Sequence, residues 1–109
     1  MATYFRTQVA KHLGTTPLDV IGTVDNNRFT VVGCNLANTI DEDVIVDVFV
    51  VDGSSTAAYY IKGLIIPPYT SAKVITNGEK LILPATSGIR IESDTENSID
   101  VTVSYVEIS

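Results

Sequence analysis

The chain has 109 residues, 45% of them hydrophobic, which is enough for one folded domain with its own core and too much for a disordered chain. Thirteen acidic against seven basic side chains give a net charge of −6. This charge argues against nonspecific nucleic-acid binding and against anionic membrane surfaces, because both need a basic surface. No apolar run approaches the roughly 20 residues that cross a bilayer, and a single cysteine excludes an internal disulfide.

Residues 1–13 are predicted to form an N-terminal arm. Arg6, Lys11 and His12 concentrate basic or titratable groups in this short segment. Its apolar residues fit a helical period slightly better than a strand; they are Tyr4, Phe5, Val9 and Leu13. We expect them to pack on the same domain or on a neighbouring subunit. The segment lacks a charged-then-apolar signal pattern, so synthesis in a cytosol without a signal peptide is expected.

Residues 14–109 are predicted to form a single all-β domain. About eight short strands recur at intervals of roughly 8 to 12 residues, with turn signals between them and no helix. The predicted strands are 18–24, 29–36, 44–50, 59–66, 72–76, 81–83, 89–92 and 99–105. This pattern is typical of an antiparallel β-sandwich, immunoglobulin-like or jelly-roll-like, or of a small barrel. The Cys…Trp…Cys spacing of antibody domains is missing, since the chain has no tryptophan.

The hairpin at residues 43–66 organises the rest of the chain. Four alternating valines, at positions 44, 46, 48 and 50, share one face of the first strand and predict a buried side. The other face is also partly apolar, through Ile45, Phe49 and Val51, and the adjacent Tyr59 and Tyr60 must face opposite ways. Because a sandwich covers only one face of each sheet, the surplus predicts a subunit contact. Coverage by a loop or by the arm remains the alternative.

The strand at 29–36 is predicted to alternate in the same way. Val32, Cys34 and Leu36 would share one face, with Phe29 and Val31 on the other. Cys34 is therefore expected to be a core residue rather than a reactive thiol.

Few residues in the sequence could support catalysis or metal binding. His12 is the only histidine, and no nucleophile–base pair accompanies it, so we expect no enzyme activity and no cofactor. Two acidic clusters, residues 41–43 and the group Asp94, Glu96 and Asp100, leave calcium binding open. They lack EF-hand spacing, and we expect no metal site.

Several short motifs resemble those of small structural proteins in the virions of tailed phages, and the match covers most of the chain. The matching segments are Gly14-Thr15-Thr16, 21–24, 36–38, 46–48, 60–63, 66–67, 78–81, 101–104 and 107–108. Similar sequences often carry Pro-Ala-Gly in place of Asp25-Asn26-Asn27, and a Gly-Asp near Ser87-Gly88. Both departures lie in predicted turns, so they bear on the subfamily more than on the fold. The resemblance implies a β-sandwich of immunoglobulin-like topology that attaches to phage heads, necks or tails.

The resemblance favours a capsid decoration or cement protein that binds the head shell, with the major capsid protein and further copies of itself as partners, a trimer being one arrangement. A neck, tail, baseplate or fibre-attachment component is the alternative, and a carbohydrate-binding module a remoter one, because its usual tryptophan platform is missing. We expect localisation in the virion, and no binding to nucleic acid or membrane. Aromatic and apolar residues dominate interface hot spots, and the predicted interface residues are Tyr4, Phe5, Arg6, Val9, Leu13, Phe49, Tyr59, Tyr60 and Tyr69.

Overall fold

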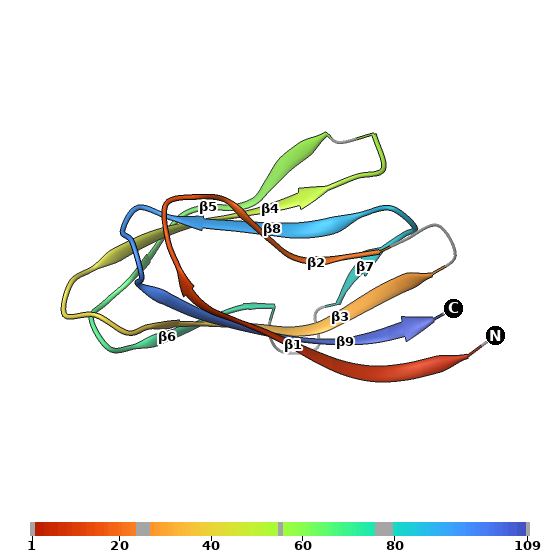
Figure 1. The fold of residues 1–109 in the computed structure, drawn as a ribbon, viewed down its shortest axis with the longest axis horizontal. Coiled ribbons are helices and arrows are strands. Elements are labelled where there is room, and N and C mark those ends of the chain that lie inside the picture. The colour runs from red at the N-terminus through yellow and green to blue at the C-terminus, as the bar shows by residue number, and fades with distance from the viewer. Residues whose placement is uncertain (1, 24–26, 55, 76–79, 109) are drawn as a thin grey trace.

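The computed structural model describes residues 2–23, 27–54, 56–75 and 80–108, which fold into two packed antiparallel sheets without a helix (Figure 1). The strands are β1 (Thr3–Leu13), β2 (Leu18–Gly22), β3 (Arg28–Asn38), β4 (Val44–Val51), β5 (Ala57–Ile66), β6 (Ser71–Ile75), β7 (Leu81–Leu83), β8 (Gly88–Ser93) and β9 (Ile99–Ile108). The predicted all-β sandwich is confirmed. Within the described ranges, no helix is long and apolar enough to cross a membrane.

The strand order is that of a jelly roll. Sheet A runs β1-β9-β3-β6, with β7 also paired to β3, and sheet B runs β2-β8-β4-β5. Strands β6 and β7 pair with different halves of β3, so they occupy one position in succession. Each connection from β1 to β4 then crosses to the other sheet, as in a double Greek key. An immunoglobulin domain instead keeps its first two strands in one sheet, so the immunoglobulin-like topology is not the one observed.

All eight predicted strands are present, and β1 is a ninth. It pairs with β9 from Thr3 opposite Ile108 to Leu13 opposite Ile99. The helical spacing assigned to this segment is therefore wrong, and the residues expected to form an arm are the outermost strand of sheet A. The predicted turns at 25–27 and 77–78 fall wholly or largely outside the described residues.

The core lies between the two sheets and is built from alternate residues of each strand. The predicted valine face of β4 is confirmed: Val44, Val46 and Val48 are buried in the core between the sheets, and Val50 is partly buried against it. In β9 the alternation predicted from residue 99 to residue 105 is confirmed as well. Burial of these branched side chains drives the packing of one sheet on the other.

One predicted face is wrong, and a β-bulge is the cause. The register of β3 against β9 shifts between Val31 and Gly33. An extra residue at this point reverses the alternation of the strand. Val31 is therefore buried together with Cys34 and Leu36, whereas Val32 points outward and is 46% exposed.

A glycine allows the close approach of β2 and β8. A Cβ atom at Gly88 would lie 2.6 Å from the carbonyl oxygen of Ile21 and 3.3 Å from the Cα atom of Gly22. Both are backbone atoms, so they cannot rotate away. We expect Gly88→Ala to lower the free energy of unfolding by about 2–3 kcal/mol through this strain.

The matched control is Gly33→Ala, because a Cβ atom there would meet only the Ser104 Cβ, at 4.0 Å. Thermal unfolding followed by circular dichroism should show a lower midpoint for Gly88→Ala and an almost unchanged one for Gly33→Ala. Equal midpoints in the two variants would contradict the backbone clash.

Candidate interaction surfaces

The outer surface of sheet A carries exposed apolar side chains from three of its strands. Phe5 is 85% exposed, Val9 66%, Val32 46% and Ile82 69%. We call these four residues the sheet-A face. Across the sheet, Phe5 pairs with Val106, Val106 pairs with Thr30, and Thr30 pairs with Ile82. Three strand spacings of about 4.8 Å place Phe5 and Ile82 about 14 Å apart in one row.

Cationic side chains flank the sheet-A face. Arg28 pairs with Ile108, and Lys73 pairs with Asn35, which puts both cations on the outer side of the sheet, with Asp100 as an anion on the same side. An open hollow of about 530 Å³ lies beside Val32 and is lined in part by Lys73. This surface is therefore apolar with a basic margin, although the whole chain carries a net charge of −6.

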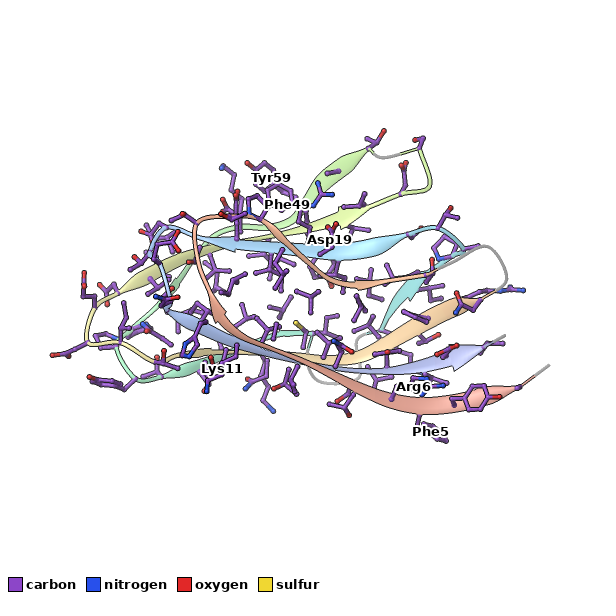
Figure 2. The ribbon with its side chains drawn as sticks, in the orientation of Figure 1. Phe5, Arg6, Lys11, Asp19, Phe49 and Tyr59 are labelled. Atoms are coloured by element: carbon purple, nitrogen blue, oxygen red, sulfur yellow. The ribbon has the colours of Figure 1, made fainter. Side chains whose placement is uncertain are left out.

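The outer surface of sheet B is different, because its aromatic residues Phe49 and Tyr59 contact other side chains of the same sheet. The rings of Phe49 and Tyr59 lie 4.6 Å apart between centroids. The Lys62 ammonium lies 4.3 Å from the centroid of the Tyr59 ring, and its hydrogen bond to the Tyr59 hydroxyl raises the pKa of Lys62. Figure 2 shows Phe49 and Tyr59 on one outer side of the sandwich and Phe5 on the opposite one. Ile45 and Ile65, which are paired and exposed, complete what we call the sheet-B face.

Irregular pairing of β5 places its two adjacent tyrosines. Tyr59 pairs with Phe49 and Ile61 with Val48, so Tyr60 is an inserted residue between them. A second irregularity follows at Gly63, whose φ is 72° and whose N–H donates to the Asp47 carboxylate at 2.8 Å. These bulges bend the outer strand of sheet B away from regular pairing.

The predicted interface residues do not form one site. Phe5 and Val9 lie on the sheet-A face, and Phe49 and Tyr59 contact each other on the sheet-B face. Tyr69 is exposed in the turn after β5, with a φ of 54°.

Three further predicted residues belong to β1. Tyr4 and Arg6 lie on its inward side, where the Arg6 guanidinium is 5.0 Å from the Tyr4 ring centroid and 2.7 Å from the Glu107 carboxylate. Leu13 is only 3% exposed and packs in the chain's own core, so it is not available to a partner. Sequence reasoning missed Val32 because of the bulge, and it missed Ile82 although the alternation of Leu81, Ile82 and Leu83 would have indicated it.

The side chains of the second acidic cluster, Asp94, Glu96 and Asp100, accept hydrogen bonds from backbone N–H groups. Asp94 accepts from the Ile45 N–H at 3.0 Å, and Asp100 accepts from the His12 N–H at 3.1 Å. Glu96 accepts from the hydroxyl and the N–H of Thr15, which lowers the pKa of its carboxyl. In the part of the chain that the structure describes, no three His, Cys, Asp or Glu side chains gather as a metal site would require.

Cys34 lies at the inner face of β3 and is 3% exposed. Burial raises the pKa of its thiol to about 12, so the reactive thiolate is scarce at neutral pH. We expect the folded protein to resist alkylation at pH 8 and to react fully once urea unfolds it. Intact-mass measurement after treatment with iodoacetamide checks this, and rapid modification of the folded chain would contradict the burial.

No protein-family model matches the chain, and a search of curated proteins finds no match. Among solved structures, a chain of the T13 particle of infectious bursal disease virus is similar, with a TM-score of 0.56 and 9% sequence identity over 96% of this chain. A second similar chain comes from the Gt strain of the same virus, with a TM-score of 0.47, 7% identity and 97% coverage. The protein spans about a third of these virus chains, 30% and 32% of their lengths. At 9% identity, the similarity to the chain of the T13 particle concerns the fold alone.

Proposed function

We propose that this protein is a non-enzymatic structural component of a virion. The observation that carries the proposal is the sheet-A face, where large apolar side chains stand in solvent without cover from the chain's other described segments. The jelly roll supports the proposal, since it is a common fold of viral capsid domains and a chain of a viral particle has a similar structure. The sequence resemblance to phage virion proteins points the same way.

The finer proposal is a decoration or cement protein on the head shell of a tailed phage. The sheet-A face would contact the shell, with the cations Arg28 and Lys73 at its margin facing acidic groups of the partner. Each contact can be weak, because many copies arranged by the symmetry of the shell add their effects. The residues 1–13 would then contact a neighbour through exposed side chains of β1, since β9 holds their backbone.

The copy number in purified particles tests both levels of the proposal. Quantitative mass spectrometry of particles of the phage that encodes the chain should find hundreds of copies for a shell component. A dozen copies or fewer would contradict the decoration role and favour the neck or tail. Absence of the chain from the particles would overturn the virion role.

The contacting surface is tested by co-sedimentation of the purified protein with particles that lack it. The double variant Val32→Lys and Ile82→Lys places charge on the sheet-A face, and we expect it to lose binding. The matched control is Ile45→Lys with Ile65→Lys on the sheet-B face, which should keep it. Equal binding by both variants would exclude the sheet-A face as the contact.

A further inference from the structure

Strand β1 ends sheet A and presents an unusually long edge. It lies last in the order β1-β9-β3-β6 and contains 11 residues, nearly all exposed. Figure 1 shows its N-terminal half diverging from sheet B. An edge strand carries unpaired N–H and C=O groups that can bind another strand.

The other edges of the sandwich are less suited to pairing. Strand β5 carries two irregularities, and β2 has only five residues with a register shift of its own. The far edge of sheet A is shared by the short strands β6 and β7. Pairing of β1 with β9 is regular from Thr3 to Ala10, which makes it the longest uninterrupted edge among the described strands.

We propose that β1 pairs antiparallel with β1 of a second copy, around a two-fold axis at Thr7, so that sheet A continues across a homodimer. An isologous contact of this kind requires a strand whose sequence is complementary to itself in reverse. In the register centred on Thr7, Phe5 of each copy lies directly opposite Val9 of the other. Both residues are highly exposed on the same face of β1, and the pairing covers each with an apolar neighbour.

Competing registers are less favourable. A register shifted by one residue would set outward side chains against inward ones, so only shifts by an even number of residues preserve the faces. A shift by two residues moves the axis to Arg6 or to Gln8. Centring the axis on Arg6 would place two guanidinium groups opposite each other, which destabilises a strand pair. Centring it on Gln8 would place Phe5 opposite Lys11 and Thr7 opposite Val9. Only the axis at Thr7 both pairs the two apolar residues and uses the whole regular part of the strand.

The charges of β1 are compatible with the proposed register. Arg6 lies opposite the neutral Gln8 of the other copy. The two Arg6 side chains become diagonal neighbours, but each guanidinium already contacts the Glu107 carboxylate of its own chain at 2.7 Å. The paired strands would therefore bring together two guanidinium groups whose charges are already compensated by Glu107.

Disulfide trapping tests the axis directly. Two residues directly opposite in an antiparallel pair have Cα atoms about 4.5–5.5 Å apart, within the range of a disulfide. Thr7→Cys should therefore form a covalent dimer under mild oxidation, seen on a non-reducing gel. The buried Cys34 does not compete, because its thiolate is scarce.

The matched control for the trapping is Thr3→Cys, which changes the same residue type on the same face of the same strand. In the proposed register the two copies of residue 3 lie about 27 Å apart, so this variant should stay monomeric on the gel. Equal cross-linking of both variants, or none of Thr7→Cys, would overturn the axis at Thr7.

Charge reversal tests the Phe5–Val9 pairing without a covalent bond. We expect the double variants Phe5→Lys/Val9→Lys and Phe5→Glu/Val9→Glu to be monomeric, because each sets like charges opposite one another. An equimolar mixture should form a heterodimer, seen by light scattering after size exclusion. Native protein that stays monomeric at about 100 µM, well above a micromolar dissociation constant, or that forms a trimer, would overturn the proposal.

The dimer does not depend on the virion role, and the two can fail separately. Loss of the homodimer with normal particle binding would contradict only the β1 pairing. A homodimer formed by a chain that is absent from particles would contradict only the proposed function.

Discussion

Replacing Asn38 by aspartate is expected to lower the free energy of unfolding at pH 7 by about 3–5 kcal/mol, because it puts an unpaired charge in a buried site. Asn38 ends β3 and is only 4% exposed. Its Nδ2 donates to the carbonyl oxygens of Glu42 at 2.7 Å, Ile66 at 2.9 Å and Pro67 at 3.1 Å. Its Oδ1 accepts from the Ile40 N–H at 3.0 Å. The side chain thus ties β3 to the connection into β4 and to the end of β5.

The aspartate would be surrounded mainly by acceptors. Three carbonyl groups would lose their donor, and burial would disfavour the ionised carboxylate, so the pKa of Asp at this position would be raised in the folded state. When the pKa of an acid is raised by folding, its contribution to the stability of the folded state is fully present below the unfolded-state pKa, near 3.9. That contribution is lost as pH rises through the folded-state pKa. The difference from the native protein should therefore shrink when urea unfolding is repeated at about pH 4.

The matched control is Asn35→Asp, three residues earlier on the same strand. Asn35 lines the hollow on the outer side of sheet A and is partly exposed, so its ionised form stays solvated. We expect a change within about 1 kcal/mol at either pH. Similar losses of unfolding free energy for both variants would show that the Asn38 side chain does not stabilise the link between β3, the connection into β4 and the end of β5.

The sequence predicted strands wherever one face is buried, and it failed where the usual pattern is reversed. In β1 the inward positions include Arg6 and Gln8, because sheet B does not cover this end of sheet A, while the outward positions include Phe5 and Val9. A pattern with polar residues inside and apolar residues outside carries no local signal for a half-buried strand.

A bulge accounts for the misassigned face of β3. Val32 faces outward because β3 has an extra residue relative to β9, and that partner strand is distant in sequence. The same limit applies to topology: strand lengths and turns predict a sandwich, but the order of strands depends on which segments pair. Phe5 and Ile82 lie in one row only because of the registers of three strand pairs, β1 with β9, β9 with β3 and β3 with β7.

Leu36→Ala should be among the most destabilising substitutions in this domain. Leu36 is 0% exposed and lies in β3 between Val101 of β9 and Ala72 of β6. Truncation of a buried leucine costs about 3–4 kcal/mol, because apolar burial is lost and a cavity remains. For a domain of this size the midpoint of thermal unfolding should fall by roughly 15–25 °C.

Val32→Ala is the control that tests the bulge, because simple alternation places Val32 and Leu36 on the same face while the structure separates them. With 46% of Val32 exposed, its truncation should change the free energy of unfolding by no more than about 0.5 kcal/mol. Scanning calorimetry of both variants measures the contrast. Losses of equal size would mean that β3 alternates without interruption, which would bury Val32 and remove one of the four residues of the sheet-A face. The calorimetric comparison therefore tests the core and the proposed contact surface together, since a single inserted residue in β3 determines both.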